Sequence, residues 1–363
     1  MGVLRLVLAI AVLIGHSNAG LFGLTMTVSG KLPVEAFYVI SGFIIAFVFT
    51  EKYAALPHGN SLFWVNRFFR LWPAFVAVGA ATAIAYWISA RLGQPVDARL
   101  HYVVGEVSKL NPVVCAIAAL PNLLLFGADW TQLFYIAPHG GLVFTPTDGV
   151  GLFAGNLLLI PQGWSLGIEA SFYVIAPWLL RRSSRVVVAV AMGSIAFRLW
   201  TYYGIGWMNN MWTYRVFPQE LALFLVGVLS YRAYRRLQPE INANVLNALG
   251  IVAAVVLIGG MVLYDKATGN WRYWSYLAAL PVLLPFLFHL TRRSAVDRYI
   301  GELSYPIYIV HVGLLPYLFA TGWPNTNGLL ATGGCVLAAI VIYLCIQRPI
   351  DRWRHHLTTR THA

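Results

Sequence analysis

The chain has 363 residues; 59% of them are hydrophobic, only 10% are charged, and the formal net charge is +12. This composition excludes an ordinary soluble domain, and three cysteines are too few for a disulfide framework. Apolar runs near or above the membrane-spanning length recur from end to end, so we expect an all-α polytopic membrane bundle. No metal-ligand spacing is present, and we expect no nucleic-acid partner.

Ten membrane-spanning helices are predicted, and alternate connections between them are basic. The predicted spans are about 3–24, 33–50, 70–90, 164–181, 186–203, 217–235, 245–264, 274–290, 303–320 and 328–346. Arginines gather at 67 and 70, at 181–185, at 232–236, at 292–298 and in the tail at 347–363. The positive-inside rule then places both termini and the basic tail in the cytoplasm.

The segment 91–163 interrupts the alternation of spans. It is long, rich in glycine, proline and aromatic residues, and is expected to stay outside as a lid or binding element. Within it, Pro112–Phe126 is apolar and is expected to be re-entrant or interfacial. The alternative pairs this stretch with Leu142–Ile160 as two further spans, which would put Gly127–Gly141 in the cytoplasm.

The first predicted helix carries Arg5 and His16 on an otherwise apolar run. Eleven residues make about three helical turns, so both side chains leave one face, about 16 Å apart along the axis. An ionisable group deep in a bilayer is a functional-site hypothesis by default, and a neutral imidazole suits a general base. The alternative is that Arg5 marks the inner helix end and His16 bonds a neighbouring helix.

Three further spans carry candidate residues, each with a plain structural alternative. Glu35 either caps the second span or faces the bundle to orient His16 or an acceptor. Arg67 and Arg70 share one helical face and are either membrane-surface anchors or a phosphate clamp. Glu169 is expected about one turn inside the outer surface, where it either caps with Ser165 or serves the site.

The later spans offer one more candidate. His311 is expected to reach a depth comparable to that of His16, either as a packed histidine or as part of the site. Arg215 and Glu220, at the start of the sixth span, are expected to pair at the outer edge.

Taken together, the motifs resemble the integral membrane acyltransferase family called acyltransferase 3. The matching segments are Arg5 with His16, Phe37-Tyr38-Val39-Ile40-Ser41-Gly42-Phe43, Arg67 with Arg70, Trp164-Ser165-Leu166 with Glu169 and Phe172-Tyr173, and Ser304-Tyr305 with Tyr308 and His311. The resemblance covers residues 1–346 in the family's order. The chain departs from the pattern at Gln347-Arg348-Pro349, where the family often has a glutamate.

The resemblance implies transfer of an acyl group, usually acetyl from acetyl-CoA, to a hydroxyl of a glycan or lipid-linked sugar at the bacterial inner membrane. It implies acyl-CoA as a co-substrate, with no tightly bound cofactor. It favours functional roles for Arg5, His16, Arg67, Arg70 and Glu169. We expect His16, Glu35, Glu169 and His311 to be catalytic, and Arg5, Arg67 and Arg70 to bind the donor. The layout then expects a basic cytoplasmic mouth for the donor, with Glu35 and Glu169 toward the outside. The rival functions are a proton-coupled polysaccharide or lipid transporter, and an acyltransferase acting on a small metabolite.

Overall fold

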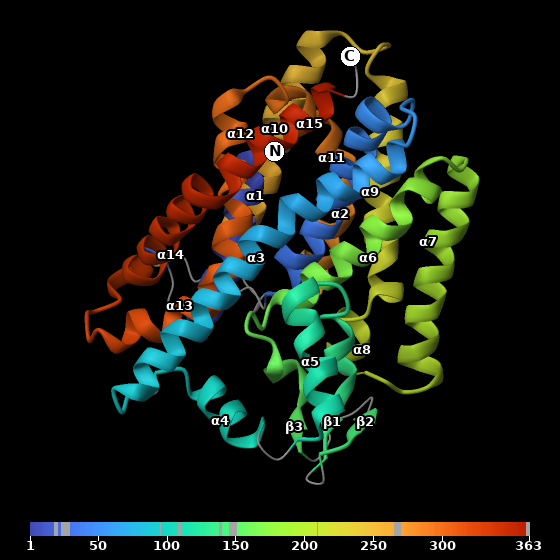
Figure 1. The fold of residues 1–363 in the computed structure, drawn as a ribbon. Helices are drawn as coiled ribbons and strands as arrows, with labels where there is room; N and C mark the ends of the chain where they lie inside the picture. Colours follow the sequence, from blue (N-terminus) through green and yellow to red (C-terminus); the bar gives the residue numbers. More distant parts are fainter. Residues whose placement is uncertain are drawn as a thin grey trace.

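The computed structural model describes residues 1–17, 21–22, 30–94, 96–107, 110–137, 140–144, 151–208, 210–264 and 270–360. Helix makes up 80% of the structure, as expected for a helical membrane protein. Met1 and the C-terminal helix α15 (Arg348–Arg360) lie at the same end of the bundle, here called the basic end (Figure 1). The strands lie at the opposite end, here called the distal end (Figure 1).

Each predicted span corresponds to one helix. These helices are α1 (Gly2–Ser17), α2 (Lys31–Val48), α3 (Gly59–Arg91), α6 (Gly163–Leu180), α7 (Ser184–Leu199), α9 (Phe217–Leu237), α10 (Ala243–Val262), α11 (Asn270–Thr291), α13 (Ser304–Ala320) and α14 (Leu329–Ile342). Short helices α8 (Asn210–Tyr214) and α12 (Ala295–Glu302) precede α9 and α13.

Length and composition select fewer membrane-crossing helices than the ten predicted spans. Seven helical stretches in the described part of the chain are long and apolar enough to cross a membrane, while α1 is a shorter apolar helix. The predicted span 3–24 is helical to Ser17, and residues 18–20 and 23–29 fall outside the described residues. Ten crossings, and the side on which each terminus lies, therefore stay predictions.

Helices α2 and α9 pack closely against each other in the core. A β-carbon on Gly42 would lie 1.9 Å from the Phe224 carbonyl oxygen, and one on Gly227 would lie 2.0 Å from that of Val39. Small residues allow helix backbones to approach this closely, and close packing is a main source of helix association in membranes. The Phe224 ring is in turn stacked on Phe172 of α6, with centroids 4.5 Å apart. Helices α2 and α6, which carry site residues, are thus both packed against α9.

The segment 91–163 adds a small sheet to a structure that is otherwise helical, as the all-α expectation requires. It holds helices α4 (Ala98–Val107) and α5 (Pro112–Leu124) and an antiparallel sheet of order β2-β1-β3, formed by Leu142–Phe144, Phe134–Ile136 and Leu152–Phe153. In the register, Tyr135 pairs with Val143 on one side and with Phe153 on the other. A separate hydrophobic cluster stabilises the segment; its buried members are Val103, Val114, Ile136, Leu152 and Ala154.

The sheet argues against the paired-span alternative. The described residues of 142–160 form two short strands and a 3-10 turn at Ala154–Leu157, and no helix that could cross a bilayer. Side-chain hydrogen bonds tie the segment to its own loops and to the bundle. The Arg99 Nη1 donates to the carbonyl oxygens of Asn156 and Leu158, at 2.7 and 2.6 Å, and the Trp72 indole donates to that of Leu123 at 2.6 Å. Its location outside the cell stays a prediction.

Candidate active site

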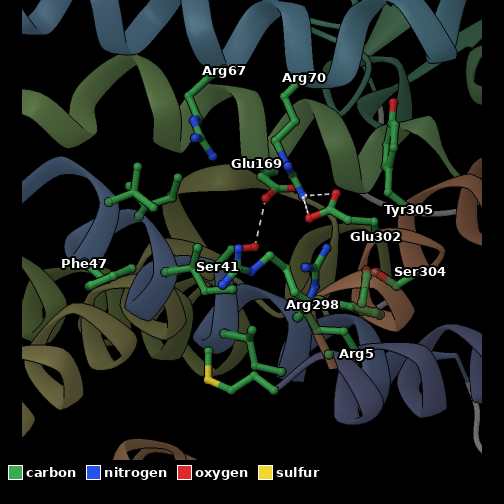
Figure 2. Close-up of a pocket in the computed structure, with 18 of the residues that line it drawn as sticks. Arg5, Ser41, Phe47, Arg67, Arg70, Glu169, Arg298, Glu302, Ser304 and Tyr305 are labelled. Carbon is green, nitrogen blue, oxygen red and sulfur yellow. Dashed lines mark hydrogen bonds and ion pairs between the residues drawn. The ribbon is translucent and has the colours of Figure 1, made fainter. Parts of the chain in front are cut away.

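A cavity of about 1190 Å³ opens between α1, α2, α3, α6, α12 and α13. Small-molecule sites typically enclose roughly 300–1,000 Å³, so this cavity has room for a large ligand. Arg5, Arg67, Arg70 and Arg298 line it from three different helices, and we call it the arginine cavity. Figure 2 shows their side chains converging on one space. The structure thus brings together all three predicted donor-binding residues, Arg5, Arg67 and Arg70.

Arg67 and Arg70 lie three residues apart on α3, so both face the cavity. The Arg70 Nη2 donates to both carboxylate oxygens of Glu302, at 2.9 and 3.2 Å (Figure 2). Arg67 is buried beside the ring of Phe63, and its Nε has no hydrogen-bond partner among the described residues. One guanidinium is therefore held by the protein, and the other carries unused donor capacity into the cavity.

Sequence reasoning missed Glu302. The sequence does mark this residue, because Glu302 is an acid at the start of an apolar run, two residues before the Ser304-Tyr305 motif. A carboxylate in such a place needs a cationic partner. The structure supplies that partner from α3, a contact between residues 232 positions apart that no local pattern could indicate.

Glu169 corrects the expected layout. It lines the arginine cavity with Arg5 and Arg67, and does not belong to a separate outer layer. Its Oε1 accepts hydrogen bonds from the Ser41 hydroxyl at 2.8 Å and from the Tyr173 hydroxyl at 2.5 Å. The expected cap with Ser165 is not formed, because the Ser165 hydroxyl is near Gln162 and Tyr308. Two of the sequence motifs thus meet through one hydrogen bond, Ser41 to Glu169 (Figure 2).

His16 and His311 lie next to each other. Their ring centroids are 5.0 Å apart in an edge-to-face arrangement, and we call them the histidine pair. The His16 Nδ1 lies 2.8 Å from the Val12 carbonyl oxygen, and the His311 Nδ1 lies 2.8 Å from that of Tyr308. A carbonyl can only accept, so both Nδ1 atoms carry hydrogen in the neutral rings, and both Nε2 atoms are left as acceptors. His311 is fully buried, whereas His16 is exposed at the distal end of α1.

A polar wall separates the arginine cavity from the histidine pair. The cavity lining includes Ser165 and Tyr308 but neither histidine. The two hydroxyl oxygens lie 2.6 Å apart, and the Tyr308 ring centroid lies 5.8 Å from that of His311. The Gln162 amide donates to the carbonyl oxygens of Tyr308 and Ile309, at 2.8 and 2.9 Å, and fixes this turn of α13.

Glu35 lies elsewhere, in a second buried cluster of charged residues. The Arg198 Nη2 donates to its Oε1 at 3.1 Å, and the Tyr273 hydroxyl donates to its Oε2. The same Arg198 lies 3.4 Å from Glu220. Glu35 and Glu169 hydrogen-bond other residues and His16 bonds the Val12 carbonyl, so the geometry does not support the expectation that a glutamate orients His16.

The predicted ion pair between Arg215 and Glu220 is wrong. The Arg215 Nη1 donates to Gln132 Oε1 at 2.6 Å, on the segment 91–163, while Glu220 faces Arg198. Arg198 was overlooked in the sequence, although an arginine inside an apolar run required a buried acidic partner. No group of three or more His, Cys, Asp or Glu that could hold a metal ion occurs in the described ranges.

Comparison with known proteins agrees with the family resemblance of the sequence motifs. The model of the acyltransferase domain family matches residues 1–347. The chain is 24% identical to Nodulation protein 10 of Rhizobium leguminosarum bv. viciae, over 90% of this chain and 84% of that protein. It is 22% identical to a protein of Staphylococcus aureus strain COL named as a candidate O-acetyltransferase, over 87% of this chain and half of that protein's length. No solved structure matches the chain. The family match over nearly the whole sequence shows that the chain belongs to the acyltransferase 3 family of membrane acyltransferases.

Proposed function

We propose that this protein transfers an acyl group, with acetyl as the first candidate, from acyl-CoA to a hydroxyl of a surface glycan or lipid-linked sugar at the bacterial inner membrane. The single observation that carries the proposal is the arginine cavity. It presents several guanidiniums to one large space whose inner wall contacts a pair of histidines.

The donor fits the chemistry of this cavity. Coenzyme A carries several phosphate charges, and guanidinium groups recognise phosphates through paired, charge-assisted hydrogen bonds. Among the described residues, Arg5, Arg67 and Arg298 form no ion pair, so their charges are available to a ligand. Acyl-CoA would bind as a co-substrate and leave as CoA, and no tightly bound cofactor is needed.

His16 is the proposed general base for the acceptor hydroxyl. Its Nε2 is the acceptor nitrogen of the neutral ring, and the residue is exposed on the side away from the basic end. An acceptor could therefore approach from the distal end while the donor enters from the basic end. A covalent acyl-histidine relay would use the same nitrogen.

The segment 91–163 is the proposed acceptor-binding element. Trp130 and Phe144 expose 62% and 48% of their surface, and exposed aromatic rings are suited to stacking on sugar rings. The Gln132–Arg215 hydrogen bond holds this segment beside α6, because Arg215 also lies over the Trp164 ring, 5.2 Å from its centroid.

A transporter without acyl chemistry is the second candidate. The observation that favours it is the cluster of Glu35, Arg198 and Glu220, because buried carboxylates within membrane bundles commonly serve proton relays. Mass spectrometry of surface glycans and lipid-linked sugars from wild-type and deletion cells separates the two. The acyltransferase predicts loss of one acyl mass per modified sugar with the glycan still exported. Loss of the exported glycan, with unchanged acylation of the intracellular pool, supports the transporter instead.

A further inference from the structure

The wall between the arginine cavity and the histidine pair has a chemical role of its own. We propose that the Tyr308 hydroxyl is a catalytic hydrogen-bond donor that stabilises the oxyanion formed when the thioester carbonyl is attacked, with Ser165 as its positioning partner. This inference rests on the proposed acyl transfer and assigns the place where the transfer occurs.

Position is the first argument. Tyr308 touches both halves of the site: its side chain lines the arginine cavity, and its ring lies 5.8 Å from His311, which is in turn 5.0 Å from His16. A donor molecule bound by its phosphates at the arginines would extend its acyl end toward the far wall of the cavity. The thioester and the base nitrogens would then meet at Tyr308.

The hydrogen bonds of Ser165 give the second argument. The Ser165 Oγ lies 2.6 Å from the Tyr308 hydroxyl and 2.9 Å from the Gln162 carbonyl oxygen, and Ser165 has only one hydrogen to donate. When that hydrogen goes to Gln162, the Tyr308 hydrogen is donated to Ser165. When Ser165 donates to the Tyr308 oxygen, the Tyr308 hydrogen is free to point into the cavity. A ligand oxygen can therefore recruit Tyr308 by a rotation of two hydroxyl hydrogens, without moving the backbone.

Unused polar capacity is the third argument. His311 Nε2 and Gln162 Oε1 are buried and have no hydrogen-bond partner among the described residues. Leaving a buried polar atom unpaired is costly, and such atoms call for an explanation such as a catalytic role. Both residues contact Tyr308 through its backbone carbonyl, so the unpaired atoms surround the same turn of α13.

The proposed step is attack of the acceptor hydroxyl on the thioester carbonyl. The acceptor oxygen attacks the thioester carbon while its proton passes to a histidine Nε2, and the carbonyl π pair moves to oxygen, which accepts a hydrogen bond from Tyr308. The tetrahedral intermediate then collapses and the carbon–sulfur bond breaks. The sulfur takes the electron pair and receives the proton from the histidine, so that an ester and free CoA are released.

Two tyrosines, one at the proposed site and one away from it, allow a matched test. The assay measures release of CoA from acetyl-CoA and transfer of radiolabelled acetyl, in membranes that hold equal amounts of protein. Tyr308→Phe is expected to lower turnover about a hundredfold, the usual effect of losing one oxyanion donor, with unchanged affinity for CoA. Ser165→Ala is expected to give a smaller loss of turnover. Tyr276→Phe removes a buried hydroxyl that donates to the Leu257 carbonyl oxygen outside the cavity, and should keep wild-type turnover.

The outcomes separate this inference from the function beneath it. Tyr308→Phe with wild-type turnover would overturn the role of Tyr308, and so would a loss of CoA affinity equal to the loss of turnover, because the hydroxyl would then be structural. Wild-type membranes that release no CoA would overturn the proposed function and this inference with it. The expected result is a large loss of turnover in Tyr308→Phe, a smaller loss in Ser165→Ala and none in Tyr276→Phe, with normal CoA binding.

Discussion

Arg67 is a buried cavity arginine that pairs with no carboxylate among the described residues. Arg67→Ala is therefore expected to weaken binding of acetyl-CoA about tenfold or more, since a hydrogen bond to a charged group contributes about 1.5–3 kcal/mol. Titration of CoA into the purified protein measures this affinity.

Arg181 provides the control for that variant. It lies exposed at the end of α6 and bonds Ala54 and Asn60, outside the cavity lining. Arg181→Ala should leave CoA affinity unchanged. If Arg67→Ala also leaves it unchanged, Arg67 is a membrane-surface anchor and the phosphate clamp is wrong.

The buried carboxyl of Asp129 should make the stability of the folded protein depend on pH. Burial raises the pKa of its carboxyl to about 7, although hydrogen bonds from the backbone N–H groups of Asp129 and Trp130 act to lower this pKa. Because its pKa is lower in the unfolded chain, the folded state binds more protons between about pH 4 and pH 7. This contribution to stability is complete below about pH 4 and is lost as pH rises through 7.

Asp129→Asn tests this dependence. The variant should show a smaller fall in the midpoint of thermal unfolding from pH 5 to pH 8 than the wild type, with the midpoint read in detergent solution. Glu240→Gln, at an exposed turn after α9, should keep the wild-type fall. Identical pH dependence in Asp129→Asn and the wild type would show that the carboxyl is not held in its neutral form.

At the scale of elements, the contact of α2 with α9 predicts a large effect of one methyl group. Gly42→Ala places a β-carbon 1.9 Å from the Phe224 carbonyl, so the helices must separate. Overpacking typically costs about 1–3 kcal/mol, and more where the neighbour is backbone. Gly193→Ala, on α7, meets nothing within 4 Å and should keep or raise stability.

Thermal unfolding and expression level compare the two alanine variants. A lower midpoint for Gly42→Ala alone is the expected result. Equal midpoints would mean that α2 and α9 pack less closely than in the structure, and the support shared by α2 and α6 would then be lost from the account.

The elements differ in how far sequence could predict them. The long apolar helices were predictable because each is marked by its own apolar composition. That composition can be read without knowing which other segments the helix packs against. The sheet in the segment 91–163 was not, because its strands are two or three residues long and pair across loops. The same limit applies to Arg198, whose partners Glu35 and Glu220 come from two other helices.

For the whole molecule, the central prediction is that the basic end and the distal end face opposite sides of the membrane. In a background without native cysteines, Tyr102→Cys marks the distal end and Glu240→Cys marks the basic end, and both positions are exposed. In intact spheroplasts a membrane-impermeant thiol reagent should label Tyr102→Cys only. Both should react after lysis. Labelling of Glu240→Cys in intact spheroplasts would reverse the orientation and remove the case for an outer acceptor site.

The candidate site shows a similar division between what the sequence predicts and what only the fold reveals. Helical spacing was sufficient to place Arg67 and Arg70 together, and to suggest equal depth for His16 and His311. It could not show that Glu169 bonds Ser41 inside the arginine cavity, or that Tyr308 stands between the two groups. Those contacts depend on how α2, α6 and α13 are packed in three dimensions.

Acetyl transfer by purified protein in sealed vesicles tests the whole account most directly. Radiolabelled acetyl-CoA is supplied on the side of the basic end, native glycan or lipid-linked sugar on the other, and His16→Ala is compared with the wild type. The wild type should label the acceptor across the membrane, while His16→Ala should bind CoA normally and label none. Substantial labelling by a well-folded His16→Ala protein would contradict it.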